Sequence, residues 1–316
     1  MGPTVYIDGR AGTTGLQIEA RLRGRCDIEQ ITIPADLRKD ADARKACLNA
    51  ADLVFLCLPE EASREAVALI DNPRTRVIDA STAHRVSPSW VYGFPEICRN
   101  RRDEIRRCSR VANPGCHATG FLAITAPLVT AQVLPRDAVV SCYSLTGHSG
   151  GGRAMIDAYA AQDRPESFGS PRIYGLGFAH KHAPEMLAQS GLLEAPLFSP
   201  IVDDHYAGMA VAILLHKSQL SSGLTSRHLR DVLGAHYQGE PFVTVAPFGG
   251  EETLERPGFI ESNAHVGTNR LEILVFGDGD RTLISARFDN LGKGASGAAV
   301  QNMNLMLGFS ETEGLL

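Results

Sequence analysis

The sequence predicts an α/β fold: a doubly wound parallel sheet, followed by an α+β domain whose sheet is largely antiparallel. In the first third of the 316-residue chain, short apolar strand-like runs alternate with helical segments of roughly ten residues. Beyond Cys116 fewer helical segments separate the strand-like runs, and a turn that contains Asp-Gly joins the last two of these runs. The final segment, Gly294 to Gly308, is helical again, so the last helix can return to the first domain.

The first domain is expected to be built from βαβ units. Strands separated by helices of this length pair in parallel, and the helices cover both faces of the sheet. The expected strands are Thr4–Asp8, Ile28–Ile33, Leu53–Leu58 and Arg76–Asp79, and the expected helices are Leu16–Arg23, Ala41–Asn49 and Glu60–Ile70.

A glycine-rich loop lies between the first expected strand and the first expected helix. This is the position of the phosphate-binding loop in a dinucleotide-binding (Rossmann) domain, where glycine lets the backbone approach a pyrophosphate. The spacing is G-x-x-G-x-x-G and departs from the usual G-x-G-x-x-G, so a plain strand-to-helix turn remains an alternative. The loop residues proposed to bind the cofactor are Gly9, Gly12, Thr13, Thr14 and Gly15.

Three charged residues follow the second expected strand, namely Asp36, Arg38 and Lys39. An acidic residue at this point binds a ribose hydroxyl, whereas nearby cations accommodate a 2′-phosphate. The two cations favour NADP(H) over NAD(H).

The second domain is expected to hold an antiparallel sheet with helices such as Ala154–Ala161 and Ser226–Tyr237. Asp-Gly between apolar runs is a strong hairpin signal, and Gly277 to Asp280 joins the last two expected strands. We expect a dinucleotide domain of residues 1–115 and 291–316, and a second, α+β domain of residues 116–290. The expected strands are Ala138–Leu145, Gly208–Lys217, Phe242–Ala246, Leu271–Phe276 and Thr282–Phe288.

Composition excludes several classes of protein. The net charge of −5 argues against nucleic-acid binding, and the Arg-rich stretch from Arg99 to Arg110 is interrupted by acidic residues and indicates a solvated helix. The sequence contains neither an apolar run long enough to span a membrane nor a secretory leader, so a cytoplasmic protein is expected. Seven cysteines without a CxxC pair indicate reduced thiols.

Cys116 is the candidate nucleophile. The turn signal Asn113-Pro114-Gly115 delivers it to the start of an apolar helical run that includes Phe121 to Val129. Unpaired N–H groups and the helix dipole favour a thiolate at that position. The alternative is that Cys116 is a small buried apolar residue, as most free cysteines are.

Two further segments contain residues that can bind an anion or transfer a proton. Ser149, Gly151, Gly152 and Arg153 precede a helix and suit an anion or oxyanion, although a flexible glycine loop has the same spacing. His180 and His182, with Glu185 three residues after the second, can exchange a proton with a thiol, although a pair of surface histidines gives the same pattern. No metal is expected, because the candidate zinc ligands have neither zinc-finger nor H-E-x-x-H spacing. Those candidates are His117, His180, His182 and His205.

In combination, several segments resemble the shorter-type N-acetyl-γ-glutamyl-phosphate reductases, a family within the aspartate-semialdehyde dehydrogenase-like group. The resemblance extends almost from end to end of the chain. It implies a Rossmann NADP domain, a catalytic and oligomerisation domain, an activity in arginine biosynthesis, and a thioacyl mechanism. The matching segments are Gly9–Gly15, Asp79–Arg85, Val91–Glu96, Asn113–Thr119, Ser149–Arg153, His180–Glu185 and Asp289–Asn302.

The resemblance also implies roles for individual residues. The nucleophile falls on Cys116 and the paired histidines on His180 and His182, of which His182 is favoured as acid and base. His117 follows the nucleophile where the family often has tyrosine, which is one departure from its pattern. The implied substrate-binding residues are Ser149, Gly151, Gly152 and Arg153 at the phosphate, with Arg85 and Glu185, and the implied cofactor-binding residues beyond the glycine loop are Arg38, Lys39, Ser81, Asn290 and Gly292.

The implied reaction is attack of the Cys116 thiolate on an acyl phosphate, loss of phosphate, and reduction of the thioester by NADPH. Two alternatives stay open. One is the same chemistry on an aspartyl or aminoadipyl phosphate, and the other is a non-catalytic dinucleotide-binding regulatory protein with a structural cysteine. The expected partners are a small-molecule substrate, phosphate and further copies of the chain in a homodimer or homotetramer.

Overall fold

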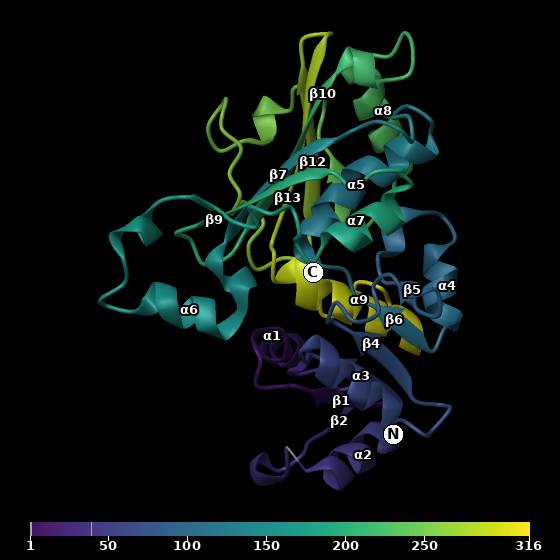
Figure 1. The fold of residues 1–316 in the computed structure, drawn as a ribbon. Coiled ribbons are helices and arrows are strands. Elements are labelled where there is room, and N and C mark those ends of the chain that lie inside the picture. Colours follow the sequence, from purple (N-terminus) through teal and green to yellow (C-terminus); the bar gives the residue numbers. More distant parts are fainter. Residues whose placement is uncertain (1, 39) are drawn as a thin grey trace. The chain divides into compact units, whose positions relative to one another are not determined.

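The computed structural model describes residues 2–38 and 40–316, and its contacts divide the chain into two units. Unit 1 comprises Met1–Pro95, Arg99–Pro114 and Ala295–Leu316. Unit 2 comprises Glu96–Cys98 and Gly115–Gly294. Figure 1 shows the elements of both, and each unit is described by itself.

Unit 1 is organised by a six-stranded sheet in the order β2-β1-β3-β4-β6-β5. Every pairing in it is parallel. The central strands are buried on both faces, since all four residues of β3 are buried. The strands are β1 (Thr4–Asp8), β2 (Glu29–Ile31), β3 (Leu53–Leu56), β4 (Arg76–Asp79), β5 (Val91–Tyr92) and β6 (Arg110–Ala112).

Helices cover this sheet as βαβ crossovers require. The C-terminal helix α9 packs against α1, α4 and β4, so the end of the chain belongs to unit 1. The segment after α9 is also bound to α4, because Arg102 donates to the Glu311 carboxylate at 2.8 Å. The helices are α1 (Thr13–Leu22), α2 (Ala41–Ala50), α3 (Glu60–Ala68), α4 (Arg101–Arg107) and α9 (Gly297–Leu307).

Unit 2 contains a mixed seven-stranded sheet in the order β11-β12-β13-β10-β7-β9-β8. The pairs β11/β12 and β7/β9 are parallel and the others antiparallel. The predicted hairpin at Gly277 to Asp280 is confirmed as the β12–β13 connection. The strands are β7 (Ser141–Gly147), β8 (Arg172–Ile173), β9 (Leu197–Asp203), β10 (Met209–His216), β11 (Val243–Val245), β12 (Leu271–Gly277) and β13 (Arg281–Phe288).

Helices α5 (Cys116–Thr130), α7 (Ala183–Ser190) and α8 (Ser226–His236) lie together on one face of this sheet (Figure 1). Helix α5 is buried along almost its whole length, and glycine at position 120 lets it approach the strands closely. A Cβ on Gly120 would lie 2.4 Å from a methyl carbon of Val211. Helix α6 (Gly152–Ala160) follows β7 in unit 2.

The predicted fold class is confirmed, and the differences are local. Strand β9 was not predicted, because Pro200 interrupts the pattern in Leu197–Asp203, and helix α7 was not predicted either. The predicted strand near Phe242 is β11, which pairs in parallel rather than as part of an antiparallel meander. The segment Gly292–Ser296 before α9 is a π-helix. Within the described residues, no helix is both long and apolar enough to cross a membrane.

Candidate active site

Cys116 is the first residue of α5, with Gly115 in extended conformation as the N-cap. No side chain caps this helix, so its first N–H groups and the positive end of its dipole lie beside the thiol. The Glu185 carboxylate, from the first turn of α7, accepts a hydrogen bond from the Gly115 N–H at 3.1 Å. The backbone at Gly294 lies close to Cys116, because a Cβ on Gly294 would lie 2.9 Å from the Cys116 Cβ.

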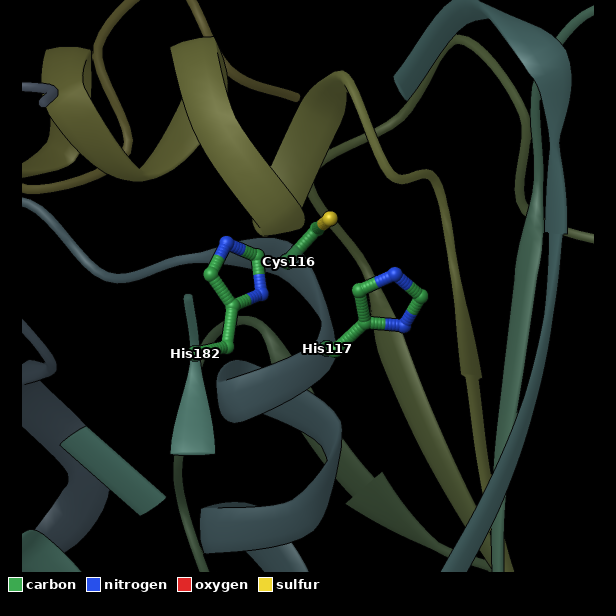
Figure 2. Close-up of side chains that lie close together, drawn as sticks. All are labelled: Cys116, His117 and His182. Carbon is green, nitrogen blue, oxygen red and sulfur yellow. The ribbon is translucent and has the colours of Figure 1, made fainter. Parts of the chain in front are cut away.

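Cys116, His117 and His182 come together at the start of α5 (Figure 2). One donor atom from each side chain, the thiol sulfur and a ring nitrogen of each histidine, lies within 4.8 Å of the other two. Both histidines are buried, whereas the cysteine is partly exposed. A nucleophile that a substrate can reach therefore has an imidazole beside it, which is the basic requirement for thiol catalysis.

His117 is held from both sides by hydroxyl groups. Its Nδ1 lies 2.7 Å from Ser144 Oγ and its Nε2 lies 2.8 Å from the Tyr174 hydroxyl. Burial, with the neighbouring His180 and Lys181, lowers the pKa of His117 to about 3, so the ring is neutral at physiological pH. Burial, with Cys116 nearby, raises the pKa of Tyr174 well above its usual value, so the phenol keeps its proton.

His180 packs edge-on against both other histidines. Its ring centroid is 5.2 Å from that of His117 and 4.8 Å from that of His182. Its Nδ1 accepts a hydrogen bond from the His182 backbone N–H at 3.1 Å, which assigns the ring proton to Nε2 when the ring is neutral. Burial lowers the pKa of His180 to about 4, so it too is neutral at physiological pH.

The glycine loop before α6 is anchored through Ser149 and Asn290. The Asn290 amide donates to Ser149 Oγ at 3.0 Å, and its oxygen accepts from the Gly208 N–H at 2.8 Å. Both side chains are buried. Asn290 thus ties the loop to the segment before β10, in addition to any role toward a ligand.

Helix α6 begins at Gly152, with Gly151 as its N-cap and no side-chain cap. Gly152 has φ of +75°, a conformation that glycine adopts without strain. The Arg153 side chain is 77 % exposed and pairs with Asp157 one turn later.

Gly292 approaches another segment closely, since a Cβ there would lie 2.1 Å from the Thr268 carbonyl oxygen.

In unit 1, the glycine loop connects β1 to α1 as predicted. Gly9 has φ of +84°, and a Cβ there would lie 2.3 Å from the Cys57 carbonyl oxygen. Helix α1 begins at Thr13, followed by Thr14, and its N-cap Gly12 provides no side-chain hydrogen bond. A Cβ on Gly15 would lie 2.5 Å from the Gly9 carbonyl oxygen, so glycine lets the loop fold back on the helix. The first N–H groups of α1 are therefore available to an anion.

A cavity of about 370 Å³ lies beside this loop, at the carboxyl ends of β1 and β2. It lies next to the point where the strand order reverses, between β1 and β3, which is where open α/β sheets bind ligands. Arg10, Arg38 and Arg44 line it. Arg44 is paired with the buried Asp8 carboxylate at 2.8 Å, and Arg10 with Glu19. Lys39, the other predicted cation, lies outside the described residues.

Ser81 and Arg85 are both buried and both make contacts within unit 1. The Ser81 N–H and hydroxyl donate to the Asp79 carboxylate, at 2.9 and 2.8 Å. The Arg85 guanidinium donates to the carbonyl oxygens of Asn113 and Ala80, each at 3.0 Å. Arg85 therefore supports the turn that leads toward Cys116.

The sequence did not single out Tyr174 or Ser144, and it named His117 only as a rejected zinc ligand and as a departure from the family pattern. Tyr174 lies in a segment without periodicity, and Ser144 is one of several hydroxyl residues on a strand. Only the fold brings these side chains to His117, so spacing along the chain carried no signal for them.

Two family descriptions together match most of the chain. "Semialdehyde dehydrogenase, NAD binding domain" matches residues 5–105, and "Semialdehyde dehydrogenase, dimerisation domain" matches residues 116–290. Among solved structures, aspartate semialdehyde dehydrogenase II from Vibrio cholerae has a TM-score of 0.71 at 15 % identity, over 97 % of this chain and 98 % of that one. The enzyme from Francisella tularensis has a TM-score of 0.70 at 15 % identity, over 95 % and 99 %.

Curated relatives are much closer in sequence. N-acetyl-gamma-glutamyl-phosphate reductase 2 of a Nostoc species is 46 % identical over 99 % of both chains. N-acetyl-gamma-glutamyl-phosphate reductase of Burkholderia orbicola is 47 % identical over 97 % of both chains, and N-acetyl-gamma-glutamyl-phosphate reductase 2 of Pseudomonas putida is 43 % identical over 99 % of both. The chain belongs to the semialdehyde dehydrogenase family and, within it, to the N-acetyl-gamma-glutamyl-phosphate reductases.

Proposed function

We propose that this protein reduces N-acetyl-L-glutamyl 5-phosphate to N-acetyl-L-glutamate 5-semialdehyde through a thioester on Cys116, in arginine biosynthesis. Membership of the reductase family supports the reaction and the pathway. The observation that carries the mechanism is the Cys116 thiol at the uncapped start of α5, with a His182 ring nitrogen within 4.8 Å.

The first step is attack of the Cys116 thiolate on the acyl carbon. A C–S bond forms, the C–O bond to phosphate breaks, and inorganic phosphate leaves, so that a thioester remains. The positive end of the α5 dipole supports the thiolate, and His182 is placed to accept the thiol proton.

NADPH, when bound, supplies the hydride that reduces the thioester carbon. The protein must then stabilise the oxyanion of the hemithioacetal, which the first N–H groups of α5 can do because no side chain caps them. The oxyanion re-forms the carbonyl, the C–S bond breaks, and the aldehyde leaves while the thiolate recovers its proton from His182.

His182 is assigned as the acid and base, and His180 as the residue that positions it. The contact that supports this division is the hydrogen bond from the His182 backbone N–H to His180 Nδ1. Glu185 is assigned a positioning role at the α5 N-terminus, because its carboxylate holds the Gly115 N–H beside Cys116.

Ser149, Gly151, Gly152 and Arg153 are proposed to hold the phosphate of the substrate. Gly152 begins α6, where uncapped N–H groups favour an anion, and the Arg153 guanidinium is exposed enough to turn from Asp157 to a ligand. Arg85, which braces Asn113, is proposed to order the substrate site.

NADP(H) is the proposed cofactor. The uncapped start of α1 suits a pyrophosphate, and the cavity beside it suits an adenosine moiety. Arg38 lines that cavity and is proposed to bind the 2′-phosphate together with Lys39. The other proposed cofactor contacts are Gly9, Gly12, Thr13, Thr14, Gly15, Ser81, Asn290 and Gly292.

A homodimer or homotetramer is proposed, formed through unit 2. The match to a dimerisation domain supports an oligomer. One face of the sheet carries exposed large apolar side chains on three strands that neighbour one another in it. These residues are Tyr143, Leu197 and Leu214. We also propose functional domain limits of 1–115 with 291–316 and of 116–290, and a cytoplasmic location.

The test is phosphate-dependent reduction of NADP and of NAD by the purified protein, with N-acetylglutamate semialdehyde and with aspartate semialdehyde. We expect turnover with the acetylated aldehyde and NADP, and none in Cys116→Ala. Turnover with only another aldehyde would keep the mechanism and replace the substrate. No turnover with any aldehyde would favour a non-catalytic dinucleotide-binding protein.

A further inference from the structure

The side chains of Cys116, His117 and His182 form a set of potential metal ligands as well as a catalytic group. Their donor atoms lie within 4.8 Å of one another, and Figure 2 shows them at the first turn of α5 and on the segment that leads into α7. A thiolate and two imidazoles are ligands that Zn²⁺ prefers, at about 2.3 Å for sulfur and about 2.0 Å for nitrogen. Donor atoms around one ion lie closer together than 4.8 Å, so the side chains must rotate toward one another to bind it.

The surroundings of His117 suit metal binding. A zinc-bound histidine usually uses its second ring nitrogen to contact an outer group, which fixes the tautomer and orientation of the ring. Both His117 nitrogens have hydroxyl partners, Ser144 on one side and Tyr174 on the other. The nitrogen that binds the ion exchanges its hydroxyl partner for the metal, and the other nitrogen keeps its own.

Of the charges near the three ligands, the Glu185 carboxylate favours a divalent cation and the Lys181 ammonium disfavours it. Glu185 places a buried carboxylate at Gly115, next to the cysteine. A thiolate and this carboxylate together balance the two positive charges of zinc, which limits the electrostatic penalty of a partly buried ion.

We propose that Cys116, His117 and His182 bind Zn²⁺ reversibly and that the bound ion inhibits the enzyme by occupying its nucleophile. In binding, the S–H bond of Cys116 breaks, a Zn–S bond forms, and the proton passes to solvent, with no change in oxidation state. Three protein ligands leave a fourth position for water. The inhibition rests on the proposed function, because it requires Cys116 to be the nucleophile, whereas the metal site does not.

The first experiment titrates the metal-free, reduced protein with Co²⁺, which replaces Zn²⁺ and reports its ligands by absorption. We expect an intense near-ultraviolet sulfur-to-cobalt band, visible bands typical of tetrahedral coordination, and loss of both on addition of Zn²⁺. Cys116→Ser should abolish the sulfur band, and circular dichroism checks that this variant is folded. A cobalt spectrum without a sulfur band, or one that Cys116→Ser leaves unchanged, would refute the site whether or not the protein is an enzyme.

The second experiment identifies the histidines by calorimetric titration with Zn²⁺. His117→Phe keeps an aromatic ring against Phe198 but removes both nitrogens, and it should weaken zinc binding by more than about tenfold. His182→Phe should do the same. The matched control is His205→Asn, since His205 contacts Ser262 and does not belong to the cluster, and its zinc affinity should equal that of the wild type. Equal zinc affinity in wild type and His117→Phe would overturn the assignment of that ligand.

The third experiment links the site to activity. Zinc should inhibit the wild type reversibly, EDTA should restore the rate, and zinc should protect Cys116 from iodoacetamide as judged by peptide mass spectrometry. If cobalt binds with a sulfur band but the protein has no reductase activity, the metal site stands and the proposed function fails. Zinc inhibition without protection of Cys116 would place the inhibitory ion elsewhere.

Discussion

Helices α1 and α5 begin in the same way and present different chemistry. Each follows a strand of the parallel sheet through a short turn, each has a glycine N-cap in extended conformation, and neither is capped by a side chain. At α1 the first residues are Thr13 and Thr14 beside an open cavity, whereas at α5 the first residue is a cysteine. The same dipole therefore favours a bound phosphate in one place and a thiolate in the other.

The two helices also differ in how firmly their first turns are held. Helix α1 buries only part of its surface, and Glu19 on it pairs with Arg10 at the rim of the cavity. Helix α5 is buried on nearly all sides, and Glu185 and Gly294 contact its start. A bound cofactor must come and go, but a nucleophile must keep one position, so rigidity is concentrated around the covalent chemistry.

The substitution with the largest expected effect on activity distinguishes the role of the α5 start from that of the α1 start. Cys116→Ala should lower the reduction rate by more than about 10⁴-fold, because no neighbouring group replaces the nucleophile. NADPH binding, followed by its fluorescence, should stay within about twofold of the wild type, since a surface distant in sequence binds it. Residual turnover of acyl phosphate near the wild-type rate would contradict the thioester mechanism.

The second-largest effect distinguishes the roles of His182 and His180. His182→Asn should lower kcat by about a hundredfold or more with little change in KM, because proton transfer is lost while substrate binding is kept. His180→Asn should have a smaller effect, as expected of a residue that acts by holding the His182 backbone. The measurement is steady-state kinetics with both variants, and the reverse order of effects would exchange the two roles.

The buried imidazole beside Cys116 predicts a pH dependence of stability. The pKa of His117 is lowered in the folded state, so the unfolded chain binds a proton more readily, and stability is complete above pH 6.5 and falls as the pH drops toward about 3. Between pH 8 and pH 5 this ring should lower the free energy of unfolding by about 2 kcal/mol. Urea unfolding of His117→Phe should show a correspondingly smaller difference between the two pH values. An equal difference in both proteins would mean that His117 does not stay neutral in the folded state.

At the α1 end, Arg38→Ala should raise the KM for NADPH by about tenfold, because a charge-assisted hydrogen bond to the 2′-phosphate is lost. The KM for NADH, which has no 2′-phosphate, should stay the same, and so should the rate of Cys116 alkylation. The measurement is the steady-state KM of wild type and Arg38→Ala for NADPH and for NADH. A proportional loss with NADH would assign Arg38 to the adenosine or to the fold instead.

The smallest effect is expected at α6, the other glycine-capped helix start discussed above. Arg153→Ala should raise the KM for phosphate in the reverse reaction by about threefold, since the side chain is exposed and its charge is screened. Asp157→Asn serves as a control, because it releases Arg153 from its ion pair without removing the cation. An unchanged KM in Arg153→Ala would remove this residue from the phosphate site.

The sequence by itself was sufficient for the fold class and for the position of Cys116. Both depend on local signals: the alternation of strands and helices, glycines at strand-to-helix turns, and a cysteine directly after Asn-Pro-Gly. Strand β9 was missed because it contains Pro200 and ends in acidic residues, and its pairing with β7 is a long-range choice that local pattern does not encode.

Only the tertiary structure decided which side chains meet around the thiol. Tyr174, Ser144 and the His180–His182 segment come from different elements and reach His117 because α7 and β7 pack where they do. Spacing along the chain argued against a metal site, yet folding places two histidines beside the cysteine. The physical reason is that helix dipoles and turns act over a few residues, whereas ligand sets and hydrogen-bond networks depend on distances in space.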